Sequence, residues 1–260
     1  FKWILPVLIV LWLVSMSIFT SPALSTLELF TPIDKLPRAM AILTIVANLI
    51  YSLEPVIVDL IDYLGAPVTF MLGGVITFAS GYALKKNSLS LFNSKGQQPR
   101  AEIRFDTQRS DYFFILFMGM ALGLTTTLLF NYLPDLLQVN LANIITWEGN
   151  WILVSVLFIT AVLSLPASDF INKIGTHKSF WLSFLTNSVA LALLFVTGSG
   201  WLTIVILLVY TASFTVLSVS SLPLAIEKAN YYEKVFCVGI FFSGVALPDG
   251  IVEVFQAMNA

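Results

Sequence analysis

The feature that most constrains this chain is a succession of apolar runs, each about as long as a membrane-spanning helix. We predict about eight of them, at residues 4–20, 36–57, 66–85, 112–132, 149–167, 179–197, 201–222 and 235–256. About 20 apolar residues in a helix cross the hydrocarbon core of a bilayer. The runs are continuously apolar rather than alternating, which disfavours a membrane barrel. We therefore expect an all-α polytopic membrane protein with about eight transmembrane helices.

The composition excludes several classes of function. Of the 260 residues, 58% are hydrophobic and 11% are charged, whereas an ordinary soluble domain has about 25% charged residues. The net charge of −2 provides no basic face for a nucleic acid. One cysteine and one histidine leave no cysteine- or histidine-based metal motif. Because no paired catalytic residues occur at a usable spacing either, we expect no enzyme, no cofactor and no metal, and we expect contact with membrane lipid.

The placement of the basic residues predicts the orientation in the membrane. All of them except Lys2 fall in or beside four alternate loops, at residues 21–35, 86–111, 168–178 and 225–234. Under the positive-inside rule these loops lie on the cytoplasmic side. The first predicted helix then enters from the outside, and we expect an odd number of helices before Phe1.

The longest and most polar link predicts the domain organisation. We expect residues 1–86 to form the end of an N-terminal helical bundle, with three helices. Residues 87–111 are then a cytoplasmic central loop, and residues 112–260 form a C-terminal bundle of about five helices. The spacing of Gly119 and Gly123, and that of Gly73, Thr77 and Gly81, is typical of helices that approach each other closely.

This order of features resembles the major facilitator superfamily, read from its fourth helix to its eleventh. In the stretch SPALSTLELFTPIDKLPRAMAILTIVANLIYSLEPVIVDLIDYLGAPVTFMLGG, Arg38 and Ala39 open a helix and Gly65 precedes the next one, as in helices four to six of the family. The segment SDFINKIGTHK resembles the family's signature loop between helices eight and nine, GxxxD(R/K)xGRR. Lys173 and Gly175 match that pattern, whereas Asn172 replaces its Asp. The resemblance implies that Asn172, Lys173 and Gly175 take part in conformational change.

The end of the chain is similar to helices ten and eleven of the sucrose/proton and glycoside/cation symporter branch. The residues that carry this similarity are Ser221, Pro223, Ala225, Gly239 and Pro248. The resemblance implies a secondary active transporter that moves a small polar solute, such as a sugar, by alternating access. It also implies that a proton or a cation drives transport, as in a symporter.

Two carboxyl groups are candidates for binding the coupling ion, because acids within membrane spans often mark pathways. Glu54 precedes Pro55, and Asp249 follows Pro248. A proline frees a backbone carbonyl and can bend a helix. Each acid has a second interpretation, as a charge at the interface between the membrane and water.

Four polar residues are candidates for lining a solute cavity. Asn48 and Tyr210 lie within predicted spans, where each either bonds a neighbouring helix or contacts the solute. Asn131 and Tyr132 end a predicted span and offer an amide and a ring, although an ordinary capped helix end would have the same residues.

A second hypothesis belongs to another class of protein. The degenerate signature loop, and the lack of lysine or arginine inside the predicted spans, are also expected of an accessory subunit that does not transport. Such a subunit would use a transporter-like fold to pack within a larger membrane complex.

Overall fold

The computed structural model describes residues 31, 35–53, 57, 63–95, 109–144 and 147–259. Within these ranges every regular element is helical and no strand occurs. The all-α fold predicted from the sequence is thereby confirmed. The predicted span at residues 4–20 and the candidate Glu54 lie outside the described residues.

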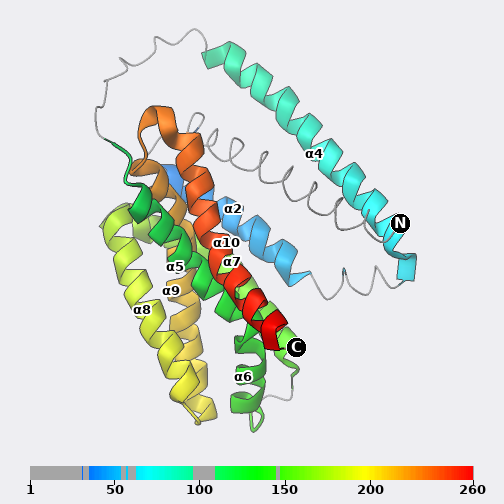
Figure 1. The fold of residues 1–260 in the computed structure, drawn as a ribbon, viewed down its shortest axis with the longest axis vertical. Helices are drawn as coiled ribbons and strands as arrows, with labels where there is room; N and C mark the ends of the chain where they lie inside the picture. The colour runs from blue at the N-terminus through cyan, green and yellow to red at the C-terminus, as the bar shows by residue number, and fades with distance from the viewer. Residues whose placement is uncertain are drawn as a thin grey trace. The chain divides into compact units, whose positions relative to one another are not determined.

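The helices follow the predicted apolar runs closely (Figure 1). They are α2 (Leu36–Ser52), α4 (Ala66–Lys95), α5 (Tyr112–Asn131), α6 (Leu133–Leu141), α7 (Gly149–Ile174), α8 (Thr176–Val196), α9 (Gly200–Glu227), the 3₁₀ turn η2 (Tyr231–Glu233) and α10 (Lys234–Asn259). Among the described residues, five helices are long and apolar enough to cross a membrane: α5, α7, α8, α9 and the part of α10 from Lys234 to Val254. The helix α2 and the segment Met71–Ala83 of α4 are apolar but shorter.

Several helix boundaries differ from the prediction; α9, for example, continues to Glu227 and α2 ends at Ser52. The helix α4 continues to Lys95 and α7 continues to Ile174, because polar residues beyond an apolar run do not by themselves stop a helix. The helix α7 ends only at Gly175, whose φ of 95° is a left-handed conformation that glycine adopts without strain. The short helix α6 was not expected; it begins at Leu133–Pro134, where a proline suits the first turn of a new helix.

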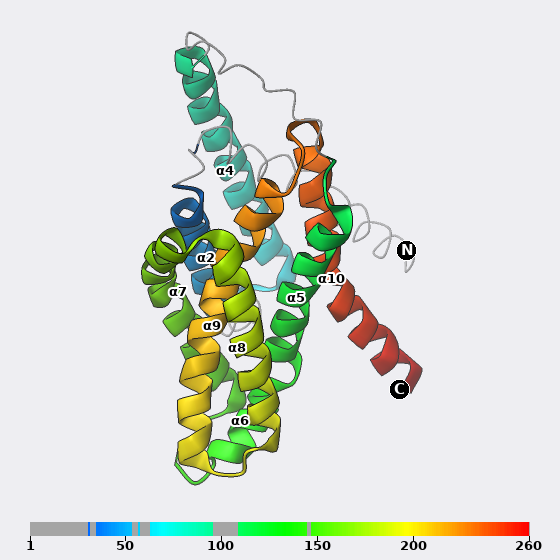
Figure 2. The ribbon, with the colours of Figure 1, turned by 90° about the vertical axis from the view of Figure 1, so that its left-hand side faces the viewer.

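The chain divides into two compact units, of which residues 53–107, with α4, form one. The other contains α2 and α5 to α10, and here α2 packs against α7 and α9 (Figures 1 and 2). The helix α2 was assigned to an N-terminal bundle, and the described residues bring it against helices of the C-terminal bundle. The division of the chain into these two bundles stays a prediction.

Two apolar clusters hold the unit of α2 and α5 to α10 together. The first joins the beginnings of α2, α5, α8 and α10 to the ends of α7 and α9, and includes Leu36, Met118, Phe180, Leu222 and Phe241. The second joins α6, the beginnings of α7 and α9 and the ends of α5 and α8, and includes Leu129, Leu137, Leu157, Leu194 and Tyr210. The two clusters therefore lie toward opposite ends of the helices.

The helices α5 and α10 lie side by side with their backbones in close contact (Figure 2). A Cβ atom added at Gly119 or Gly123 would fall far inside van der Waals contact with the carbonyl oxygen of Phe241 or Val245. From the other helix, a Cβ atom at Gly244 would lie 2.5 Å from the carbonyl oxygen of Leu116. The close approach predicted from Gly119 and Gly123 is confirmed, and α10 is the partner helix.

A single methyl group at this contact should separate α5 from α10. We expect Gly119→Ala to lower the stability of the purified full-length protein in detergent by about 1–3 kcal/mol, because the rigid backbone of α10 cannot move aside without loss of packing. Helix propensity alone would give the opposite sign, a gain of about 0.5–1 kcal/mol. The measurement is the unfolding midpoint by heat or denaturant.

Gly250→Ala is the matched control for this change. Gly250 lies on α10, and no heavy atom lies within 4 Å of a Cβ atom added there. The stability of the Gly250→Ala protein should therefore equal that of the unchanged protein or be slightly higher. Equal midpoints for Gly119→Ala and Gly250→Ala would contradict the close contact.

Candidate functional site

A cavity of about 190 Å³ lies between α2 and the helices α5, α7, α9 and α10. Leu222 and Phe241 of the first cluster and Leu157 and Phe214 of the second line it, so it lies between the two clusters. From α2 it is lined by Met40, Leu43, Thr44, Ala47, Asn48 and Tyr51. We call this space the α2 cavity.

The polar groups of the α2 cavity come from three helices. Thr44 and Asn48 stand one turn apart on α2, Ser218 and Ser221 lie on α9, and Thr126 lies on α5. The Thr126 hydroxyl donates to the Leu122 carbonyl of its own helix at 2.9 Å. Among the described lining residues none is charged.

Asn48, like Thr44 and Ser218, is a polar residue of the cavity whose side chain makes no hydrogen bond to a described residue. Its side chain is only 8% exposed, and its amide makes no hydrogen bond to any described residue. A carboxamide has two N–H donors and an acceptor oxygen. Among the described residues, the side-chain polar atom that is both cut off from solvent and unpartnered belongs to Ser179, so the Asn48 amide keeps accessible surface. The predicted solute candidate Asn48 therefore lies in a cavity, with its hydrogen-bonding capacity unused in the described part of the chain.

Aromatic rings make up much of the rest of the wall. Tyr51 of α2 meets Phe130 of α5 edge to face, with 5.5 Å between ring centroids. Phe241 and Phe242 of α10 make a second edge-to-face pair at 5.3 Å. Such surfaces suit the flat or apolar face of a small molecule.

The candidate Tyr210 lies in the second cluster, fully buried, and is not among the residues that line the α2 cavity. Its hydroxyl donates to the Thr125 carbonyl at 3.4 Å. The Thr125 hydroxyl accepts a bond from the Asn187 amide at 3.1 Å, and Ser213 donates to the Asn187 oxygen at 3.4 Å. These bonds join α5, α8 and α9. A role of Tyr210 in solute contact stays a prediction.

The structure joins two candidates that the sequence analysis treated separately. The Asn131 amide at the end of α5 donates to Oδ1 of Asp249 on α10 at 3.2 Å, and both side chains are exposed. The candidate Tyr132 is 42% exposed and separates α5 from α6. No sequence pattern indicated the pairing of Asn131 with Asp249, because the two residues lie 118 positions apart.

The predicted signature loop is a tight link between α7 and α8. Asn172 and Lys173 are exposed in the last turn of α7, and Gly175 both ends α7 and precedes α8. Any other residue at Gly175 would strain the backbone, since φ is 95° there. The conformational role of these three residues stays a prediction.

A further set of hydrogen bonds, which the sequence did not indicate, joins loops at one end of the helices. The Ser110 hydroxyl donates to Oε2 of Glu233 at 2.5 Å and accepts from the Asn230 backbone N–H at 2.8 Å. This joins the start of α5 to the link between α9 and α10. The hydrogen bond from Ser110, followed by the one from Tyr112, holds the pKa of Glu233 below its ordinary value.

The same end carries the described basic loops. Ser110 follows Arg109, Glu233 precedes Lys234, and the His177 ring beside Lys178 lies 6.3 Å from the ring of Phe114 on α5. The loops before α5, between α7 and α8, and between α9 and α10 therefore meet at one end of the helices. Their assignment to the cytoplasm stays a prediction.

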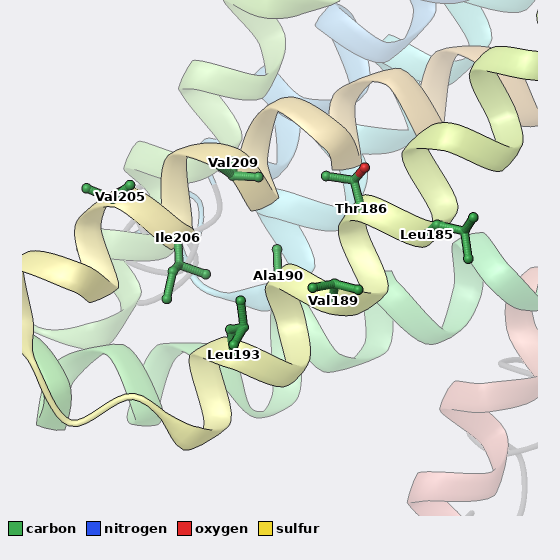
Figure 3. A pocket seen from close by; sticks show the side chains of 8 residues that line it. All are labelled: Leu185, Thr186, Val189, Ala190, Leu193, Val205, Ile206 and Val209. Carbon is green, nitrogen blue, oxygen red and sulfur yellow. The ribbon is translucent and has the colours of Figure 1, made fainter.

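A second hollow, of about 370 Å³, lies on the outer faces of α8 and α9 (Figure 3). Its wall is apolar except for Thr186, and Leu185, Val189 and Val205 are each more than half exposed. Such a surface is suited to lipid chains rather than to a polar solute. Among the described residues no group of three or more His, Cys, Asp or Glu side chains could hold a metal ion.

Comparison with known families agrees with this arrangement. The family model described as Major Facilitator Superfamily matches residues 2–248. No curated protein and no solved structure gives a significant match. The chain therefore belongs to the Major Facilitator Superfamily, a family of multi-pass membrane transporters, and the predicted superfamily is confirmed. The sucrose/proton and glycoside/cation branch stays a prediction.

The bond between Ser110 and Glu233 predicts a stability that depends on pH. Because the pKa of Glu233 is lowered in the folded protein, its contribution to stability is fully present above the unfolded pKa of about 4.5. The contribution is lost as the pH falls through the lower folded value. We expect Glu233→Gln to unfold at a lower temperature than the unchanged protein at pH 6–7, and the two midpoints to converge below about pH 4.5.

The control for this comparison is Asp135→Asn, which removes an exposed acid in the first turn of α6, toward the opposite end of the helices. The difference in unfolding temperature between Asp135→Asn and the unchanged protein should not vary with pH in the way expected for Glu233→Gln. A gap for Glu233→Gln that persists unchanged to pH 3 would contradict the proposed bond.

Proposed function

We propose that the protein is a secondary active transporter that carries a small polar solute through the α2 cavity by alternating access. The observation that supports this proposal best is the position of the cavity between α2 and the helices of the C-terminal bundle, with the Asn48 amide, unpartnered among the described residues, in its wall. Transporters built from two helical bundles bind their solutes where the bundles meet, near the middle of the membrane.

The contacts at the two ends of the α2 cavity are suited to opening one end of the cavity at a time. Toward the basic end, Leu36 and Met40 of α2 pack in the first cluster with Leu222 and Phe241. Toward the other end, Tyr51 of α2 meets Phe130 of α5. A tilt of α2 about Asn48 would loosen one set of contacts while keeping the other. The apolar side chains that form both sets can slide past each other without losing hydrogen bonds.

Coupling to an ion is assigned to Asp249. Its carboxylate accepts the Asn131 amide and so joins the end of α5 to α10. Binding of a proton or a cation would neutralise the carboxylate and weaken this charge-assisted bond. Ion binding would thereby change how α5 and α10 hold together near the cavity. Glu54, the second candidate, lies outside the described residues and stays a prediction.

The alternative of an accessory subunit that does not transport is not favoured, since the superfamily consists of transporters. No feature of the described residues supports a binding surface for a larger complex.

The test is uptake by the full-length protein reconstituted in vesicles. Labelled sucrose, methyl glucoside and nicotinamide are offered with an imposed proton or sodium gradient. We expect at least one of them to accumulate above its equilibrium level, and empty vesicles to show no accumulation. A correctly folded protein that moves none of these probes would contradict the transport proposal.

Substitution of Asp249 separates coupling from movement of the solute. We expect Asp249→Asn to lose gradient-driven accumulation by at least about tenfold while exchange of labelled for unlabelled solute continues, because the amide cannot bind a proton. Glu253→Gln is the control, an exposed acid one turn further along α10. Accumulation by Asp249→Asn at the level of the unchanged protein would end the proposed coupling role.

A further inference from the structure

We propose that the α2 cavity selects an uncharged ring compound with an apolar face and one hydrogen-bonding edge, and that Asn48 recognises this edge. This inference rests on the proposed function, because it assigns the solute class of the same cavity. It goes further by stating which charge, shape and polar pattern the solute has, and which residue discriminates.

The first argument is the charge of the wall. None of the described lining residues is charged, and the polar ones carry hydroxyl or amide groups. An ion that leaves water for such a site loses its hydration, and no opposite charge replaces it. A neutral molecule of the same shape has no such penalty. The described part of the wall therefore discriminates against carboxylates and ammonium groups.

The second argument is the distribution of rings. Tyr51 and Phe130 line the cavity from α2 and α5, and Phe241 and Phe242 line it from α10, each pair edge to face. Rings on several sides provide contact area for a flat molecule or for the apolar face of a sugar ring. The volume of about 190 Å³ lies below the range of about 300–1,000 Å³ for drug-sized ligands. The solute is accordingly small, on the scale of one ring with its substituents.

The third argument is the unused hydrogen-bonding capacity of Asn48. Thr126 and Ser221 already donate to the carbonyls of Leu122 and Ser218, and so offer the solute only acceptor positions. The Asn48 amide makes no hydrogen bond to a described residue although the side chain is only 8% exposed. It can therefore donate to the solute and accept from it at one edge. Thr44, one turn away on α2, lines the cavity beside it.

Asn187 shows what a structural amide looks like in the same helical unit. It is 1% exposed and its amide donates to the Thr125 hydroxyl, while its oxygen lies 3.4 Å from the Ser213 hydroxyl, whose one proton also points to the Tyr210 carbonyl. Asn48 lacks such partners among the described residues, and its amide keeps accessible surface at the cavity. This contrast indicates recognition of a solute rather than interhelical bonding for Asn48.

The experiment uses the purified full-length protein and two series of probes that share a ring and a similar size and carry different charges. The first series is nicotinamide, nicotinate and 1-methylnicotinamide, and the second is methyl glucoside, glucuronate and glucosamine. Each probe is added at millimolar concentration, and the shift in unfolding temperature and the apparent dissociation constant are measured. We expect the neutral member of at least one series to stabilise the protein, and its anionic and cationic partners to bind at least about tenfold more weakly.

Substitutions then test Asn48 itself. We expect Asn48→Leu to weaken binding of the neutral probe by about tenfold. The unliganded protein should keep or raise its unfolding temperature, because the variant removes an unpartnered polar group. Asn187→Leu should instead lower the unfolding temperature and leave the preference for the neutral probe unchanged. Asn48→Asp, which introduces a carboxylate, should shift the preference toward the cationic probe.

The inference is overturned if a charged probe binds as well as its neutral partner, if none of the six probes binds, or if Asn48→Leu binds the neutral probe normally. These outcomes differ from a failure of the transport proposal. A neutral probe that binds through Asn48 but is not moved across vesicles would contradict transport and keep the assigned solute class. A charged probe that is transported would contradict the solute class and keep transport.

Discussion

The structure depends on one constraint, the absence of water as a hydrogen-bonding partner inside a bilayer. Every polar group in a span must find its partner within the protein. Serines and threonines meet this requirement locally: Thr160, Ser164, Thr211 and Thr215 each donate to a carbonyl four residues earlier in their own helix. Among the described residues, the Ser179 hydroxyl is the one side-chain polar group that is cut off from solvent and has no hydrogen-bond partner. The Asn48 amide differs from Ser179, because it borders a cavity and keeps accessible surface, and there we propose that a bound molecule supplies its hydrogen bonds.

The helices are joined in two different ways, and the difference bears on movement. The helices α5 and α10 meet backbone to backbone at Gly119, Gly123 and Gly244, whereas the bond between Asn131 and Asp249 lies further along both helices. The helix α2 meets its neighbours through side chains such as Leu36, Met40 and Tyr51. The alternating access that we propose would move α2 against the other helices that line the α2 cavity. The bond between Ser110 and Glu233 joins the start of α5 to the link between α9 and α10 at the basic end.

Local sequence predicted the helices better than it predicted their ends or their contacts. Continuous apolar runs predicted α5, α7, α8, α9 and α10, because a span long enough for the membrane has to be apolar along its length. The extensions of α4 and α7 and the separate helix α6 were missed, since a helix can continue into water wherever no residue breaks it. Asn48, Asn131 and Asp249 were selected as unusual polar groups in or beside apolar runs. That Asn131 bonds Asp249, and that Tyr210 is buried away from the α2 cavity, could not be read from residues so far apart in the chain.

By itself the sequence determined the class of the protein: a multi-pass helical membrane chain of the Major Facilitator Superfamily, with glycines placed for a close helix contact. These properties follow from composition and spacing along one helix, where each residue acts through its own position. Only the tertiary structure decided which helix the glycines meet, which polar groups share a bond and which amide stays unpaired in a cavity. Partner choice depends on side chains brought together from helices more than a hundred residues apart, such as Asn131 and Asp249. The pattern of residues within a single span does not indicate which residues of other helices that span will contact.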